Sequence, residues 1–494
     1  MTRAFGHPDF AAVREEFALP ATFPPAVLAE AAVAAATSPG PGPDRVDATG
    51  VELVTIDPPG SKDLDQALGV VRRGDGFRVH YAIADLGAVV VPDGVLDAEV
   101  RRRGQTVYLP DGSVPLHPPA LSEGSASLLP DGPRAAVLWR IDLDGAGEPL
   151  AVDVRRAVVA SRARLDYAGV QGTVDAGRVH PAIDALAVLG PLRRALAVRR
   201  GAIELELPEQ EVVRAPHACP ADQRRSGASW RSTGEVTGGW TVEVRRRTAV
   251  EDWNAEISLL TGMSAARIML DAGIGLLRTL PAAEPDAVAD LREAARGLGV
   301  DWPAGESPAA LLAGLPRDTS VALALRRAAT GLLRGAGYTA FDTSAGTAPP
   351  ADPGHAGIGA PYAHVTAPLR RLVDRFGTEL CLALTAGAAV PDWLRAALPE
   401  LPGTMAASDA VAGSVARACV DRTEAAVLAG RVGAEFDAVV LRAGSGSGGP
   451  GEIYLLEPAV VARCTGELRR GETARVRLVE ADPATGRIAF GAAR

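Results

Sequence analysis

The chain carries the run Thr55-Ile56-Asp57-Pro58-Pro59-Gly60-Ser61-Lys62-Asp63-Leu64-Asp65-Gln66, with aspartates on both sides of a Pro-Pro-Gly turn. The apolar segment Val51–Ile56 predicts a strand that delivers Asp57 to that turn. Asp63 and Asp65 follow at an i, i+2 spacing, which places both carboxylates on one side of an extended backbone. Crowded carboxylates repel each other unless protons or a cation compensate, and their hard oxygens suit Mg²⁺ or Mn²⁺. An ordinary solvated turn is the alternative, because Asp, Gly and Pro are common turn formers.

Length and composition exclude several classes of protein. The 494 residues are 47% apolar and 22% charged, which allows a sizeable core and excludes a wholly disordered chain. No apolar run approaches the roughly 18 residues that span a bilayer, and the charged N-terminal stretch lacks the apolar core of a signal peptide. Four widely spaced cysteines argue against a zinc site and a disulfide framework: Cys219, Cys381, Cys419 and Cys464. The sequence therefore predicts a soluble, cytoplasmic protein, and we expect a monomer.

The net charge of −9 gives no global basic field, so any nucleic-acid site has to be local. Arginine clusters at Arg101–Arg103, Arg245–Arg247 and Arg370–Arg371 are candidates, although each alone is typical of a solvated helix face. Lys62 is the only lysine and Asn254 the only asparagine, a skew that most simply reflects the codon bias of a G+C-rich genome.

The first 430 residues contain both short β-like segments and longer helical patterns. Besides Val51–Ile56, strands are expected at Phe77–Ile83 and Ala135–Leu143. Helical periodicity predicts helices at Pro25–Ala36, Ala182–Arg199, Asp252–Ala272, Glu284–Arg296, Ser320–Arg334, Ala367–Leu384 and Ala406–Arg431. Pro- and Gly-rich composition predicts a linker at Ser38–Pro43 and an exposed loop at Arg214–Gly239.

The C-terminal pattern is all-β. Short strands are predicted at Phe436–Arg442, Ile453–Leu456, Val460–Cys464, Ala474–Val479 and Ile488–Phe490, with a flexible hairpin tip at Gly444–Gly451. Five strands in so short a segment favour a compact barrel such as an OB-fold, with a small sandwich as the alternative. Its arginines could follow a nucleic-acid backbone: Arg463, Arg469, Arg470, Arg475 and Arg477.

Further motifs follow the acidic loop along the chain. They are Tyr81–Asp85 (YAIAD), Arg103–Asp111 (RGQTVYLPD), Pro115, Leu121-Ser122, Ser127-Leu128, Leu165–Tyr167, Val250–Asp252, His355–Ile358 and Tyr362–Arg371 (YAHVTAPLRR). Together they resemble the ribonuclease II / ribonuclease R family of RNB-domain exoribonucleases, over roughly Val46 to Arg431. The resemblance implies an α+β fold, in which an RNB catalytic domain with a mixed β-sheet core surrounded by helices precedes the C-terminal OB-fold barrel.

The resemblance also implies a metal-dependent site. Asp57, Asp63, Asp65 and Gln66 would be metal ligands, and Asp63, Asp65 and Arg370 the catalytic residues. Mg²⁺, or Mn²⁺ in its place, would activate water and neutralise charge on the phosphate. Arg370 would grip the scissile phosphate, because a planar bidentate donor suits phosphate oxygens.

The resemblance also implies that other residues contact RNA. Tyr108 would stack on the last base, Tyr167 would help to hold the terminal nucleotide, and Glu251 would lie near the terminal ribose. Glu251 also stands where a carboxylate caps a helix N-terminus. For His355 and His364 we expect structural hydrogen bonds, for Lys62 relief of repulsion within the loop, and for Arg371 and Arg375 positions on a helix surface.

Two positions depart from the family pattern. The family usually has a fourth aspartate where this chain has Gln66, and a serine where it has Ala367. An amide oxygen can ligate a metal but brings no charge, so we expect weaker metal affinity.

We expect three parts: residues 1–45 as an N-terminal helical extension and Pro/Gly linker, 46–430 as the catalytic domain, and 431–494 as an RNA-binding OB-fold domain. The segment before Val46 is too short for the cold-shock domains that typical family members carry there, so a more open RNA entrance is expected.

The function expected from these motifs is processive 3′-to-5′ hydrolysis of single-stranded RNA to 5′-mononucleotides. The alternative is a catalytically weakened or inactive RNB-fold protein with an RNA-binding or regulatory role. Gln66 favours this alternative. A metal-dependent phosphodiesterase for small substrates has no supporting motif.

Overall fold

The computed structural model describes residues 8–493 except 38–43, 206, 208, 215–239, 246, 317–318, 445–448, 456 and 459. The expected linker at Ser38–Pro43, residues 215–239 of the expected loop and residues 445–448 of the expected hairpin tip lie outside the described residues.

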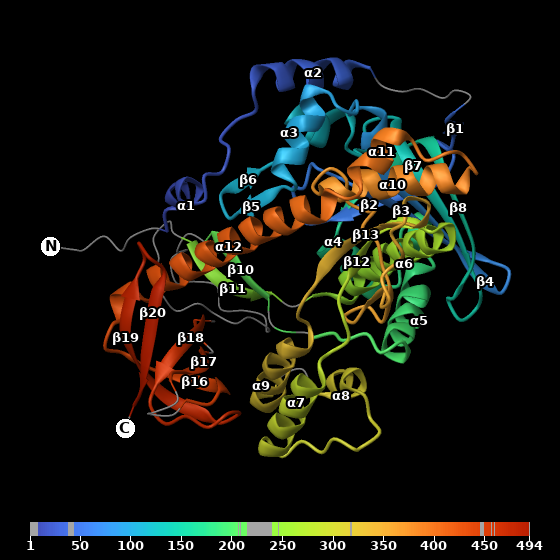
Figure 1. The fold of residues 1–494 in the computed structure, drawn as a ribbon. Helices are drawn as coiled ribbons and strands as arrows, with labels where there is room; N and C mark the ends of the chain where they lie inside the picture. The colour runs from blue at the N-terminus through green and yellow to red at the C-terminus, as the bar shows by residue number, and fades with distance from the viewer. Residues whose placement is uncertain are drawn as a thin grey trace.

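A seven-stranded sheet forms the centre of the larger part of the chain (Figure 1). Its spatial order is β1-β8-β7-β4-β3-β2-β9, and neighbours are antiparallel except for the parallel pairs β1–β8 and β2–β9. The strands are β1 (Val46–Asp47), β2 (Leu53–Asp57), β3 (Gln66–Arg73), β4 (Gly76–Ala84), β7 (Arg134–Leu143), β8 (Pro149–Val159) and β9 (Ser161–Asp166). Apolar residues of the central strands, with Trp139 and Tyr81 fully buried, make the largest core.

Helices pack around this sheet and contribute to the same core. The long helix α6 (Ala249–Ala272) begins with a capping box between Thr248 and Glu251 and ends at Gly273, whose φ of 72° is left-handed. It packs against α5 (Leu186–Arg199) and α10 (Leu372–Thr385). The other elements of this part are α1 (Phe10–Glu16), α2 (Pro25–Ala36), α3 (Val95–Arg103), α4 (Tyr167–Asp175), α11 (Asp392–Ala397), β5 (Val107–Leu109), β6 (Gly112–Val114), β14 (Gly354–His355) and β15 (Ala360–Pro361).

A helical insert, residues 280–336, projects from two paired strands. The strands β12 (Ile274–Thr279) and β13 (Gly337–Asp342) are antiparallel, and Thr279 pairs with Gly337, so the two ends of the insert lie side by side. Between them stand α7 (Pro285–Gly297), α8 (Pro308–Gly314) and α9 (Ser320–Ala329), which close a small apolar core of their own. The sequence predicted α7 and α9 but not that they form a separate unit.

The C-terminal strands close into a five-stranded barrel, as the sequence predicts. The strands are β16 (Glu435–Arg442), β17 (Gly451–Leu455), β18 (Val460–Thr465), β19 (Thr473–Asp482) and β20 (Arg487–Ala492). Their order, β16-β17-β18-β20-β19, has one parallel pair, β18–β20, and closes through β16–β19. This is a closed barrel of the OB type rather than a sandwich. The long helix α12 (Leu401–Leu428) leads into it, and Leu428 is buried in the barrel core.

The expectation that Arg371 and Arg375 lie on a helix surface is wrong. Arg375 is 3% exposed and donates to the fully buried Asp97 at 2.6 Å. Arg371 forms a two-bond pair with the fully buried Asp374. Each arginine is paired with a carboxylate, which is the condition under which charged side chains are buried.

The arginine cluster Arg101–Arg103 and the barrel arginines are also engaged. Arg102 and Arg103 both bind Glu99, and Arg101 binds Asp97. In the barrel, Arg475 pairs with Asp437 at 2.9 Å and Arg477 pairs with Glu435 at 2.8 Å. These carboxylates reduce the positive field that the sequence alone would assign to the arginines.

A buried carboxyl group lies where α12 meets both the barrel and a β-hairpin. The hairpin pairs β10 (Glu209–Arg214) with β11 (Trp240–Arg245). The side chain of Glu424, in α12, is buried and accepts a hydrogen bond from Gln210 at 2.5 Å. Burial raises the pKa of Glu424 to about 8, against the hydrogen bonds from Gln210 and the backbone of Val461.

We therefore expect Glu424→Gln to change how stability depends on pH. The folded chain keeps a proton on Glu424 that the unfolded chain releases, so the wild-type free energy of unfolding falls as pH rises to about 8. Glutamine cannot ionise, and the variant loses this decline. Melting temperatures of the two proteins should match at about pH 5, and that of the variant should be several degrees higher at about pH 9. Each kcal/mol of difference in the free energy of unfolding corresponds to about 2–4 °C.

The exposed barrel variant Glu467→Gln is the control, and its pH profile should follow the wild type. Parallel declines in wild type and Glu424→Gln would show that Glu424 does not stay protonated in the folded chain.

Candidate active site

The acidic loop joins β2 to β3, and a buried serine fixes its shape. Asp57 is the last residue of β2 and Gln66 the first of β3. The Ser127 hydroxyl donates to the carbonyl of Lys62 at 2.6 Å and accepts from the backbone N–H of Leu64 at 3.0 Å. Ser127 and Leu64 are both fully buried, so the loop is tied down on each side of Asp63. An ordinary solvated turn would have no such anchor.

Asp65 connects the acidic loop to the segment 365–371. Asp65 is 4% exposed, and its carboxylate accepts a hydrogen bond from the backbone N–H of Leu369 at 2.7 Å. Its second oxygen lies 3.4 Å from the Nε of Arg370, whose side chain is 49% exposed. The arginine therefore touches the buried carboxylate with one edge and leaves the rest of its guanidinium open to a ligand.

Three further hydrogen bonds hold the segment 365–371. The backbone N–H of Ala367 donates to Asp374 at 2.7 Å, and the N–H of Thr106 donates to the carbonyl of Arg370 at 2.8 Å. The Nδ1 of His117 lies 3.0 Å from the carbonyl of Leu369 and must carry a proton to donate to it. Burial lowers the pKa of His117 to about 4, so the ring is neutral near pH 7.

Two tyrosines flank the carboxylates. The hydroxyl of Tyr108, in β5, donates to Asp63 at 3.0 Å, and its side chain is half exposed. The hydroxyl of Tyr167, at the start of α4, accepts from the side-chain amide of Asn254 at 3.3 Å. Burial raises the pKa of Tyr167, and the charges of Asp57 and Glu251 add to the effect. The predicted residues Asp57, Asp63, Asp65, Arg370, Tyr108 and Tyr167 thus belong to one neighbourhood.

The carboxylates of this neighbourhood carry an electrostatic cost. Burial raises the pKa of Asp57 to about 6 and that of Asp65 to about 8, and the charge of Asp63 adds to both shifts. Arg370 acts in the opposite direction on both carboxyl groups. Within the described ranges, no group of three or more His, Cys, Asp or Glu side chains is set to hold a metal ion by itself.

Gln66 and Glu251, two other predicted site residues, have side-chain oxygens that accept hydrogen bonds from the protein. The side-chain oxygen of Gln66 accepts from the hydroxyl of Tyr81. Glu251 accepts from the backbone of Thr248 at 2.7 Å, completing the capping box of α6, and pairs with Arg245 at 2.5 Å. The structure thus leaves the ligand role of Gln66 and the ribose role of Glu251 as predictions.

The remaining predictions near the site have mixed outcomes. The expected structural hydrogen bond of His364 is confirmed, since its Nδ1 lies 2.7 Å from the hydroxyl of Tyr338. The Nδ1 of His355 is buried and has no partner among the described residues, so the same expectation fails at that atom. Lys62 is exposed and lies 4.0 Å from Glu123 rather than against the aspartates.

Sequence reasoning missed three positioning residues. Ser127 had been noted only as part of a motif, and nothing in the sequence marks His117. Asn254 offered a signal, because it is the single asparagine of the chain, yet codon bias explained its rarity without its contact to Tyr167.

Comparison with known proteins adds family relationships to this geometry. The RNB domain family matches residues 45–379, and the RNase II-type exonuclease C-terminal S1 domain family matches residues 434–493. Ribonuclease R of Escherichia coli (strain K12) is 29% identical over 348 residues, which are 67% of this chain and 39% of that protein. The match therefore spans about two-fifths of the curated relative's length.

Two solved structures show how far the fold is shared. Mycoplasma genitalium RNase R, in complex with ribose-methylated single-stranded RNA, has a TM-score of 0.82 at 19% identity, covering 98% of this chain and 77% of that one. Yeast Ssd1, a pseudonuclease, has a TM-score of 0.65 at 14% identity, covering 88% and 53%. The sequence match to the RNB domain extends over more than half of the chain and ends close to the barrel, which the S1 match covers. The chain therefore belongs to the RNB-domain family of exoribonucleases, with an RNase II-type S1 domain at its C-terminal end.

Proposed function

We propose that this chain is a divalent-metal-dependent exoribonuclease that hydrolyses single-stranded RNA processively, in the 3′-to-5′ direction, to 5′-mononucleotides. The observation that carries the proposal is the contact between the buried Asp65 and the half-exposed Arg370. An acidic group and an open guanidinium side by side suit a phosphodiester, whose phosphate needs positive charge on one side and a metal-bearing carboxylate on the other.

The donor set suits Mg²⁺, with Mn²⁺ as a substitute. Asp57, Asp63 and Asp65 supply hard carboxylate oxygens, and the raised pKa values of Asp57 and Asp65 reflect buried acids that a cation would stabilise in ionised form. Mg²⁺ commonly keeps several waters and binds through one or two carboxylates plus substrate phosphates, so a closed three-residue cluster is not required. Once bound, the ion would activate water and offset charge on the reacting phosphate.

Each other residue has a task that its surroundings support. Arg370 would direct its exposed edge at the scissile phosphate, because its opposite edge is held by Asp65. Tyr108, half exposed and fixed through its hydroxyl to Asp63, would offer its ring to a base. Tyr167, steadied by Asn254, would contact the terminal nucleotide. Stacking on a π face accepts any base, which suits an enzyme without sequence preference.

An inactive RNA-binding protein is the second candidate function. Gln66 favours it, because the amide lowers the negative charge of the acidic loop and its oxygen is engaged by Tyr81. The likeness of fold to a pseudonuclease shows that this architecture also occurs without activity. The retained Asp57, Asp63, Asp65 and Arg370 favour the active enzyme.

Asp65→Asn is expected to abolish RNA hydrolysis and leave RNA binding within a few-fold of wild type. The amide can still accept from Leu369, but it brings no charge for a cation. Cleavage of a 5′-labelled single-stranded oligoribonucleotide with Mg²⁺, resolved on a gel, measures the first effect, and fluorescence anisotropy measures the second. Glu424→Gln is the matched control, because it also removes a buried carboxyl group with a raised pKa and should retain full activity.

Arg370→Gln should lower the rate of cleavage by about 10²–10³-fold, the usual loss when one donor to a developing charge is removed. Single-turnover cleavage of the same RNA gives the rate. Lys62→Gln removes an exposed charge from the acidic loop and should change that rate little. Equal losses of cleavage rate in the two variants would mean that the rate depends only on the overall charge near the loop.

Gln66→Asp separates the two candidate functions. A fourth carboxylate should lower the Mg²⁺ concentration that gives half-maximal cleavage, because each added charge strengthens cation binding. A wild type without activity that becomes active in this variant would identify the natural chain as the inactive form. An unchanged Mg²⁺ requirement would show that residue 66 serves Tyr81 and not a metal.

A further inference from the structure

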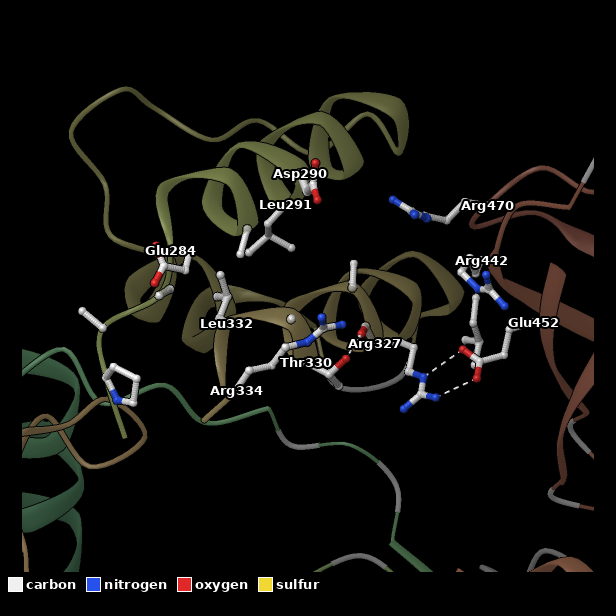
Figure 2. Close-up of a pocket in the computed structure, with 17 residues that line it drawn as sticks. Glu284, Asp290, Leu291, Arg327, Thr330, Leu332, Arg334, Arg442, Glu452 and Arg470 are labelled. Atoms are coloured by element: carbon white, nitrogen blue, oxygen red, sulfur yellow. Dashed lines mark hydrogen bonds and ion pairs between the residues drawn. The ribbon is translucent and has the colours of Figure 1, made fainter. Parts of the chain in front are cut away.

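A pocket of about 620 Å³ lies between the helical insert and the barrel, as Figure 2 shows. Asp290, Leu291 and Arg334 line it from the insert, and Arg442 and Arg470 line it from the barrel. None of the lining residues belongs to the acidic loop or to the segment 365–371, so the pocket is separate from the candidate active site. Its volume is in the range of small-molecule sites.

Two contacts fix the walls of this pocket to each other. Arg327 of α9 forms two hydrogen bonds with Glu452 of β17, at 2.9 and 2.6 Å (Figure 2). Gly471 has a φ of +83°, and a Cβ there would lie 2.0 Å from the Cδ2 of Leu298 in the insert. A Cβ at this position would force the Leu298 side chain to shift, so the insert and the barrel meet in a packed interface. The pocket is part of that interface.

The same interface covers the barrel face that OB-folds commonly use. The second and third strands of an OB-fold and the neighbouring loops usually bind oligonucleotides. Here those strands are β17 and β18, and Tyr454 and Val461 on them join Val439 and Leu441 of β16 in an apolar cluster against Leu323 of α9. Beside α9, the pocket borders β16 through Leu441 and Arg442, and β17 through Glu452.

The pocket holds positive charge without a matching protein partner. Arg334, Arg442 and Arg470 form no ion pair with any residue that the structure describes. The Nε of Arg470 is buried and lacks a hydrogen-bond partner among the described residues, which marks a place for water or a ligand. Arg327 and Glu452 neutralise each other.

The opposite wall carries two carboxylates, Glu284 and Asp290, so the pocket is only moderately positive. A compact anion with further hydrogen-bonding groups fits this balance better than a polyphosphate, which the carboxylates would repel.

We propose that this pocket binds a nucleotide through its phosphate, either as one unit of an RNA strand or as a free 5′-mononucleotide. The choice of a nucleotide rests on the proposed function. Arg442 and Arg470 hold the phosphate, since guanidinium donors suit its oxygens. The partly buried Ala283, Ala287 and Ala328 offer apolar surface to the base. The exposed Asp290 can accept from a ribose hydroxyl or a base amino group.

The test uses the full chain in EDTA, so that nothing is hydrolysed, with AMP and a fluorescent oligoadenylate as separate probes. Calorimetry measures AMP binding, and anisotropy measures RNA binding across salt concentrations. The double variant Arg442→Gln/Arg470→Gln should weaken at least one of the two by about tenfold or more. If RNA is the ligand, the log–log salt slope should also fall by about 0.7 for each lost phosphate contact.

The matched control is Arg267→Gln/Arg487→Gln, which removes the same charge from exposed positions outside the pocket. Its arginines are paired with Asp271 and Glu480 and do not line the pocket, so neither probe should bind more weakly. Arg334→Gln tests the insert wall and should weaken binding in the same direction as the pocket double variant. Melting temperatures check that all variants fold, including those at the half-buried Arg470.

Loss of AMP binding alone identifies the free nucleotide as the ligand, and loss of RNA binding alone identifies the strand. Wild-type affinities in the pocket variants, or equal losses in the control, overturn the proposal. A wild type that binds neither probe overturns it as well. The chain could also bind a nucleotide through Arg442 and Arg470 and yet fail to cleave RNA with Mg²⁺. That result would support this inference and reject the proposed hydrolysis.

Discussion

The hydrogen bond from the backbone N–H of Leu369 to the carboxylate of Asp65 is the constraint on which the candidate site depends. It joins two segments 304 residues apart in sequence. Burial disfavours the ionised form of Asp65, while this bond and the nearby Arg370 favour it, and a bound cation would favour it further. Much of the surrounding structure secures the two partners: Ser127 ties down the acidic loop, and His117, Thr106 and Asp374 tie down the segment 365–371.

Most of these supporting bonds have a backbone atom as donor or acceptor. Backbone groups have fixed positions and carry no net charge, so they orient Asp65 and Arg370 without adding another charged group to the site. Charge is then concentrated in a few side chains, and a change in one of them alters the chemistry more than the fold. A site so built should retain its shape when one charged side chain is replaced by a neutral one of the same size, as in Asp65→Asn.

Local patterns predicted much of the fold, while packing between distant segments was beyond them. The barrel strands and the helix at Pro25–Ala36 follow periodicity and turn residues, and the structure has them within a few residues. The insert at residues 280–336 was missed because pairing of Thr279 with Gly337 leaves no local trace. Arg375 was misplaced because its partner, Asp97, is 278 residues away. The site aspartates and Arg370 came from motifs, whereas Ser127, His117 and Asn254 act through contacts that no motif encodes.

The barrel is held at two places, and together they limit what it can do. One is α12, whose Leu428 enters the barrel core and whose Glu424 is bonded to the β10–β11 hairpin. The other is the insert, through Arg327 with Glu452 and through Leu298 against Gly471. A body attached to two separate elements cannot rotate about either one without breaking the other contact. The barrel is therefore restrained by both α12 and the insert, and the contacts with the insert also hold the two walls of the pocket together.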